Sequence, residues 1–164
     1  MKWNLRPASP ADLPAIKALV DLAYRVEDFF IDGNRTDGED LEALLSEGAF
    51  LMAETPERNL EGSVYIRVRP PRGYFGMLSV HPAAQGAGLG RALVRAAERY
   101  CRDRGCTDMD LSVVNLRTEL IPWYRRLGYT ECGSEPFPDV GKLKQPAHFV
   151  LMSRSLTPPG GATP

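Results

Sequence analysis

The segment from Tyr74 to Gly105 constrains the fold more than any other part of the chain. An apolar, strand-like run ends at Val80, the glycine-rich stretch Gln85–Gly90 follows, and apolar residues then recur at helical spacing until Gly105. Glycines without side chains let several backbone N–H groups approach one anion at the positive end of a helix. The segment therefore predicts a strand, a phosphate-binding loop and a helix in succession.

The spacing of the glycines differs from that of the two common nucleotide-binding loops. The dinucleotide fingerprint would require a glycine in place of Leu89, and the Walker motif would require a lysine in place of Arg91. A Gly-x-Gly-x-Gly spacing also occurs in flexible turns that bind nothing. Taken alone, the loop leaves open a phosphate site of another kind and a plain strand-to-helix turn.

Composition and segment pattern indicate a single domain of mixed α/β type. The 164 residues are 43% hydrophobic and 25% charged, with a net charge of -1, which is ordinary for a globular protein. The expected strands are residues 3–6, 50–53, 63–68, 74–80, 109–114 and 148–153, and the expected helices lie within residues 10–23, 27–47, 90–104 and 118–127. The three central strands form an antiparallel meander. We expect the domain to span residues 1–156 and residues 157–164 to be a disordered tail.

Several classes of partner are not expected. Lys and Arg are scattered without interleaved aromatic residues, so nucleic acid is not the predicted partner. Neither a run of 18 apolar residues nor a signal peptide is found, so no membrane association and a cytoplasmic location are expected. The three cysteines and two histidines lack the spacing of metal ligands or of a disulfide framework, so no metal is expected.

Two further motifs carry a resemblance to a known family. Val80-His81-Pro82 followed by Gln85-x-x-Gly88-x-Gly90 resembles the acetyl-CoA motif, (Q/R)-x-x-G-x-(G/A), of the GNAT acetyltransferase superfamily. Residues 5–13 resemble the first strand and helix of that family, and Trp123–Tyr129 resembles its Tyr-x-x-x-Gly-aromatic motif. The resemblance covers about residues 2–156. It implies the GNAT fold, a central twisted and mostly antiparallel sheet flanked by four helices, and an acetyl-CoA-dependent N-acetyltransferase.

The resemblance also implies which residues bind acetyl-CoA. Backbone amides of the glycine loop hold the pyrophosphate, and the preceding strand pairs with the pantetheine arm as an added strand would. Arg91 assists a phosphate or is simply a solvated helix residue. Asn115 is a candidate because it follows a strand beside the cofactor groove, although the common pattern places an Asn nearer the tyrosine. The cofactor-binding candidates are Leu78, Ser79, Val80, Gln85, Gly86, Ala87, Gly88, Leu89, Gly90, Arg91 and Asn115.

Tyr124 is the candidate general acid. The reaction needs a neutral amine to attack the thioester and a proton for the departing thiolate. A phenol with a pKa of about 10 stays protonated at neutral pH. Spacing alone permits a merely packed tyrosine, and the resemblance favours the acid role. The positions where relatives carry a base are here Gly76 and Tyr74, so ordered water, Glu54 and deprotonation in solution all remain open.

The acceptor is expected to be a primary amine of a small molecule or a peptide. In the resembled family the first two helices and their loop frame the acceptor site, and here that loop is strongly acidic, which would attract a cation. A solvated charged loop fits the same pattern. The acceptor-site candidates are Tyr24, Glu27, Phe29 and Tyr74. The alternative function is a catalytically weak acyl-CoA sensor or interaction module on the same fold. The sequence leaves the oligomeric state open, with a homodimer as one option.

Overall fold

The computed structural model describes residues 3–33, 38–138 and 140–157, and the predicted tail from residue 158 onward lies outside this part. One seven-stranded sheet has the order β1-β2-β3-β4-β5-β7-β6. The strands are β1 Asn4–Pro7, β2 Ala49–Glu54, β3 Leu60–Arg69, β4 Arg72–Val80, β5 Asp108–Val114, β6 Thr130–Pro136 and β7 His148–Ser155. The helices are α1 Leu13–Ala23, α2 Gly38–Glu47, α3 Leu89–Arg102 and α4 Leu120–Arg126, with a short 3₁₀ turn, η2, at Tyr24–Glu27.

The predicted fold class is confirmed. Every neighbouring pair of strands is antiparallel except β4 with β5, which is parallel. The meander β2-β3-β4 lies where the three strand-like runs predicted it. Strand β6 was not predicted, because all seven of its residues are exposed and carry no apolar alternation. Within the described residues, no helix is both long and apolar enough to cross a membrane.

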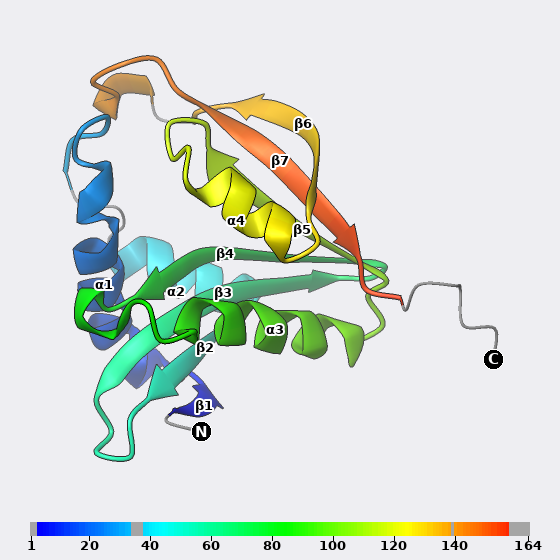
Figure 1. Ribbon diagram of the computed structural model, residues 1–164. Coiled ribbons are helices and arrows are strands. Elements are labelled where there is room, and N and C mark those ends of the chain that lie inside the picture. The colour runs from blue at the N-terminus through cyan, green and yellow to red at the C-terminus, as the bar shows by residue number, and fades with distance from the viewer. Residues whose placement is uncertain (1–2, 34–37, 139, 158–164) are drawn as a thin grey trace.

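The sheet opens into a wedge between β4 and β5. The two strands pair only from Arg72 to Tyr74, opposite Asp108–Asp110, and beyond this point they diverge (Figure 1). Strand β4 is also bulged, because Val64 on β3 faces both Met77 and Leu78. Met77 has a left-handed backbone with φ 49°, and a bulge bends its strand and increases the local twist. The second half of β4 therefore has an edge that β5 does not cover.

An ion pair fastens the closed end of the wedge. The guanidinium of Arg72 binds the carboxylate of Asp110 through two hydrogen bonds, of 2.8 and 2.6 Å, and also donates to the Ser153 hydroxyl at 3.0 Å. Hydrogen bonding from Arg72 lowers the pKa of Asp110. Strands β4, β5 and β7 are thus joined where the wedge begins.

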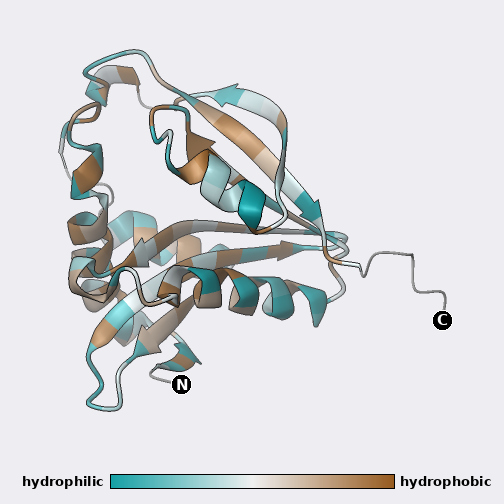
Figure 2. Ribbon diagram, viewed as in Figure 1, coloured by the Kyte–Doolittle hydropathy of each residue, from teal (hydrophilic) through white to brown (hydrophobic). Residues whose placement is uncertain are grey.

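Helices cover both faces of the first half of the sheet. Alternate residues of a strand point to opposite faces, so Phe50 and Met52 pack with α1 and α2, while Leu51 and Ala53 pack with α3. Helix α3 is strongly amphipathic, with an apolar side toward the sheet and a polar side outward (Figure 2). Cys101 lies fully buried on that apolar side. This packing holds the start of α3 beside the open end of the wedge.

Candidate active site

The glycine loop presents free backbone donors to the wedge. Gly88 caps α3 with φ 88°, Gly86 has φ 85°, and no side chain caps the first turn of the helix. The first backbone hydrogen bond of α3 runs from the N–H of Ala92 to the carbonyl of Gly88. In residues 3–33, 38–138 and 140–157, no backbone carbonyl is found to accept from the N–H groups of residues 86–90. Such a cluster of donors at a helix start can bind an anion.

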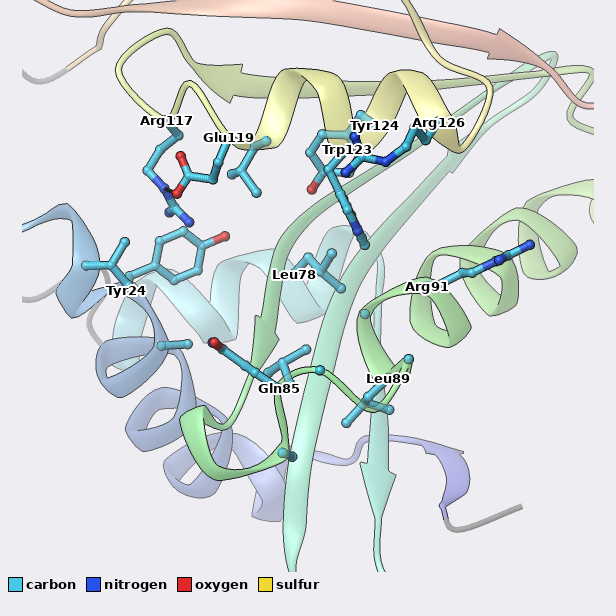
Figure 3. Close-up of a pocket in the computed structure, with 18 residues that line it drawn as sticks. Tyr24, Leu78, Gln85, Leu89, Arg91, Arg117, Glu119, Trp123, Tyr124 and Arg126 are labelled. Atoms are coloured by element: carbon cyan, nitrogen blue, oxygen red, sulfur yellow. Dashed lines mark hydrogen bonds and ion pairs between the residues drawn. The ribbon is translucent and has the colours of Figure 1, made fainter.

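A groove of about 640 Å³ extends from this loop along the open edge of β4 (Figure 3). It lies between η2, the loop, the start of α3, and α4. Its lining comprises Ala23, Tyr24, Val26, Leu78, Val80, Ala84, Gln85, Gly86, Gly88, Leu89, Gly90, Arg91, Arg117, Glu119, Leu120, Trp123, Tyr124 and Arg126. The size and the basic rim are suited to an elongated ligand that carries phosphates.

Eight of the eleven predicted cofactor-binding residues line this groove, and three do not. Ala87 belongs to the loop but is not part of the lining. Ser79 is buried, and its hydroxyl donates to the carbonyl of Met77 at 3.1 Å, so its side chain braces the bulge. Asn115 accepts a hydrogen bond of 2.8 Å from the His148 N–H, which joins the ends of β5 and β7.

The sequence did not identify Trp123, Arg117 and Arg126 as residues that line the groove. Trp123 projects from α4 toward the start of α3, where a Cβ on Gly90 would lie 3.4 Å from the indole (Figure 3). Arg117 and Arg126 also line the groove. A signal for Trp123 was present, since Leu120, Trp123 and Tyr124 share one face of a helix. Arg117 lies in a loop and gave no such signal.

Tyr124 is held in an aromatic cluster and is only 6% exposed. Its ring lies 5.0 Å from that of Trp123, 6.0 Å from Phe75 and 6.2 Å from Tyr129. Burial, followed by repulsion from Tyr24, raises the pKa of Tyr124. No hydrogen bond to the Tyr124 hydroxyl is found among the described residues, and the hydroxyl points into the cavity (Figure 3). The phenol stays protonated and is available to a ligand.

A second pocket, of about 270 Å³, meets the groove at Tyr124. Its lining comprises Tyr24, Glu27, Leu44, Tyr74, Phe75, Gly76, Met77, Leu78, Leu111, Ser112, Val113, Val114, Leu120, Tyr124 and Phe149. The two cavities share the residues Tyr24, Leu78, Leu120 and Tyr124. A molecule in each would thus meet beside the Tyr124 hydroxyl.

Three of the four predicted acceptor-site residues, Tyr24, Glu27 and Tyr74, line the second pocket. Phe29 does not. It is 52% exposed, and its ring packs edge-on against Phe30 at 5.0 Å. The turn η2 explains the difference, because it directs Glu27 inward and leaves the next two residues, Asp28 and Phe29, at the surface.

Glu27 is a buried carboxylate, only 2% exposed. Its Oε2 accepts a hydrogen bond of 2.9 Å from Nη1 of Arg117, whose Nε donates to Glu119 at 3.2 Å. Two carboxylates thus share one guanidinium. The ion-paired residues lie at the boundary between the groove and the second pocket.

Glu54, which the sequence offered as a base, lies away from both cavities. Its Oε1 accepts a hydrogen bond of 2.8 Å from Arg6, which joins β1 to β2. The other two positions considered, Gly76 and Tyr74, line the second pocket but carry no carboxylate or imidazole. Glu27 is the one carboxylate among the described residues that line this pocket.

The family model described as Acetyltransferase (GNAT) family matches residues 18–129. The chain belongs to the GNAT family. The streptothricin acetyltransferase of Streptomyces lavendulae is 29% identical over 147 residues, which cover 88% of this chain and 72% of that protein. A mycothiol acetyltransferase of Cellulomonas flavigena is 32% identical over 148 residues, covering 79% of this chain and 42% of the other. This GNAT chain therefore spans less than half of that longer relative.

Solved structures of GNAT proteins share the fold. The ribosomal-protein-S18-alanine N-acetyltransferase of Escherichia coli superimposes with a TM-score of 0.78 at 17% identity, covering 99% of each chain. The phosphinothricin acetyltransferase of Sinorhizobium meliloti, solved in complex with acetyl-CoA, gives a TM-score of 0.75 at 18% identity, covering 100% of this chain and 94% of that one. At such identities the likeness shows the fold alone.

Proposed function

We propose that this GNAT protein transfers the acetyl group of acetyl-CoA to a primary amine of a small molecule or peptide, with Tyr124 as the general acid. The observation that carries the proposal is the position of Tyr124 in the wall that the groove shares with the second pocket. One cavity then takes the donor and the other the acceptor. The proton donor stands between them.

The groove suits acetyl-CoA, which brings an acyl thioester when bound. The N–H groups of residues 86–90 are directed to its pyrophosphate, and Arg91 and Arg126 on the rim balance the phosphate charge. Leu78 and Val80 on the uncovered edge of β4 line the path of the pantetheine arm. Acetyl-CoA bound to the Sinorhizobium meliloti structure, which has the same fold, supports this assignment.

Tyr124 supplies the proton that the leaving group needs. The amine nitrogen bonds to the thioester carbonyl carbon, the carbon–sulfur bond breaks, and the O–H of Tyr124 gives its proton to the sulfur. The proton lost by the nitrogen then restores the phenol through water. Amide and free thiol are formed with no net change at the protein.

Burial affects the acid and the leaving group alike. It raises the pKa of Tyr124 by disfavouring the phenolate. A coenzyme A thiolate that forms in the same water-excluded site is disfavoured for the same reason. The pKa of the leaving thiol therefore rises together with the pKa of Tyr124. The phenol also remains protonated across the neutral and mildly alkaline range.

The relatives and the pocket both support a primary amine as the acceptor. The names of the relatives mention streptothricin, mycothiol and the alanine of ribosomal protein S18. The second pocket is small and ends at Tyr124, which suits a group that reaches in with one nitrogen. We therefore propose a primary amine as the acceptor group.

The test compares Tyr124→Phe with Tyr100→Phe, a control tyrosine on α3 whose ring stacks on the Arg104 guanidinium outside both cavities. Thiol release from acetyl-CoA is followed with a panel of primary amines. Loss of the acid should lower kcat by about 10²–10⁴-fold while acetyl-CoA affinity stays within about threefold. Unchanged kcat in Tyr124→Phe would remove this residue from the mechanism. Binding of acetyl-CoA without acetylation of any amine would favour the sensor alternative.

A further inference from the structure

The side chain of Tyr74 extends along its own strand, β4, toward the open part of the wedge. A Cβ atom built on Gly76 would lie 2.6 Å from the Tyr74 hydroxyl oxygen and 3.1 Å from two of the ring carbons. The hydroxyl therefore lies over Gly76, in space that any side chain at this position would take. Gly76 lines the second pocket, so the missing side chain brings the phenol to the wall of that pocket.

Contacts with β3 and with the core hold the ring of Tyr74 in this orientation. Arg67 pairs with Tyr74 across β3 and β4, and its guanidinium carbon lies 4.8 Å from the centre of the ring. A cation over the face of an aromatic ring is attracted by the π electrons. The ring is also half-buried against the core beside α1 and α2. These contacts fix the ring and leave its hydroxyl end at the pocket.

Ser112 on β5 lies across the gap from this hydroxyl. Tyr74 pairs with Asp110 in the last step of the ladder between β4 and β5, and Ser112 is two residues further along β5. Residues two apart in a strand point to the same face of the sheet, so Tyr74, Gly76 and Ser112 share one face of the wedge. Ser112 also lines the second pocket. The two hydroxyl-bearing residues thus stand on opposite sides of one gap.

The hydroxyls of Tyr74 and Ser112 are not used inside the protein. Across residues 3–33, 38–138 and 140–157, neither hydroxyl is found to make a hydrogen bond. Asp110, on the same face, is already bound by the guanidinium of Arg72. A hydroxyl can both donate and accept a hydrogen bond. The two groups are therefore suited to an uncharged oxygen of a ligand, such as a hydroxyl or an amide carbonyl.

We infer that Tyr74 and Ser112 select acceptors that carry an uncharged hydroxyl or carbonyl oxygen near the reacting amine, and that Gly76 positions the Tyr74 hydroxyl. The inference rests on the proposed acetyl transfer and adds to it the class of acceptor. The pocket volume of about 270 Å³ equals that of about nine water molecules at ~30 Å³ each, so the oxygen lies within a few bonds of the nitrogen. A methyl group in place of the oxygen would leave both hydroxyls without a partner.

A pair of isosteric amines measures this selection. In 3-aminopropan-1-ol a hydroxyl takes the place of the terminal methyl group of n-butylamine, and kcat/KM is measured for both with acetyl-CoA. The ratio of the amino alcohol to the alkylamine is compared among variants, so the different basicity of the two amines cancels. Tyr74→Phe should lower the ratio at least about fivefold, mainly through the KM of the amino alcohol. Tyr100→Phe, whose ring also stacks on a guanidinium but lies outside both cavities, should keep it within about twofold.

Gly76→Ala displaces the Tyr74 hydroxyl without removing it. This variant should lower the ratio about as much as Tyr74→Phe, and the double variant should lower it no further, because both changes remove the same contact. Ser112→Ala should lower the ratio at least about twofold. An unchanged ratio in Tyr74→Phe, or an equal loss in Tyr100→Phe, would overturn the inference. An unchanged ratio in Gly76→Ala would overturn the positioning role of the glycine.

Failure of the proposed function has a different signature. If mass spectrometry finds no N-acetyl product, binding of the same two amines is measured by calorimetry on the full chain saturated with coenzyme A. A preference for the amino alcohol that is lost in Tyr74→Phe would then contradict acetyl transfer and leave the recognition in place. Acetylation of both amines with a ratio that Tyr74→Phe leaves unchanged would contradict the recognition and leave acetyl transfer in place.

Discussion

Adding one methyl group at Gly88 tests whether the loop needs its left-handed backbone. Gly88 has φ 88°, and a Cβ built there meets no atom within 4 Å. Any effect of Gly88→Ala therefore comes from the backbone and not from a clash. An L-residue in this conformation costs about 1–2 kcal/mol. Since 1.4 kcal/mol corresponds to about a factor of ten, the total effect is about 5–30-fold in an equilibrium constant.

This cost is divided between the free energy of unfolding and the affinity for acetyl-CoA. If the free loop keeps its shape, the cost lowers the free energy of unfolding and leaves acetyl-CoA affinity alone. If the free loop relaxes, stability is retained, and the loop must be strained again when it binds. Urea denaturation measures the first quantity and calorimetric titration with acetyl-CoA the second. Their sum should reach about 1–2 kcal/mol in either case.

Gly90→Ala is the matched control, because it adds the same methyl group to the same loop without the left-handed backbone. The new Cβ would lie 3.4 Å from the Trp123 ring, an ordinary contact. We expect acetyl-CoA affinity within about threefold of wild type. The reasoning is refuted if Gly88→Ala changes neither stability nor affinity, or if Gly90→Ala weakens binding more than Gly88→Ala does.

Three further predictions concern the packing around the site. Glu98→Ala should lower the free energy of unfolding by about 3–5 kcal/mol, because the buried Glu98 carboxylate accepts a hydrogen bond from the Tyr129 hydroxyl at 2.8 Å. In the same urea titration Glu98→Gln should lower it by less. An equal loss in both variants would contradict a role for the charge. Burial raises the pKa of Cys101 to about 12 and also raises that of Tyr129, whereas the unfolded groups ionise near 8.5 and 10, roughly. The folded state then holds more protons, so stability should fall as pH rises above about 8.5, and a flat urea midpoint to pH 11, roughly, would count against it. In a Trp3→Phe background, indole emission from Trp123 should change when acetyl-CoA fills the groove, and no change at saturation would place the ligand elsewhere.

Local patterns were sufficient for most of the fold. Strand-like runs between turn-rich stretches predicted the meander, and the helical spacing after Gly90 predicted α3, because each of these segments packs in a core. Strand β6 was not predicted, because it buries no face in a core. The side chains of β6 are exposed, and the strand is held by backbone pairing with β7. Backbone pairing leaves no pattern of apolar side chains in the sequence.

The site was predictable where its residues are close in sequence, and less so elsewhere. The glycine loop and the Tyr124 segment are each short motifs, so each could be found without knowing the other. Whether Glu27 or Phe29 lines the second pocket depends on the orientation of the 3₁₀ turn η2. The sequence could not distinguish the two residues. Arg117 is separated from Glu27 by 90 positions, so their ion pair exists only after folding.

The wedge in the sheet explains why two cavities meet at one phenol. A continuous pairing of β4 with β5 would fill the edge that now lines the groove and would close the second pocket. The bulge at Met77 and the short parallel pairing at Arg72 keep the strands apart, and α4 places Tyr124 at the gap. In the proposed reaction the acceptor would approach from the side of the gap opposite the donor. The two ligands would then meet at Tyr124, the proposed proton donor.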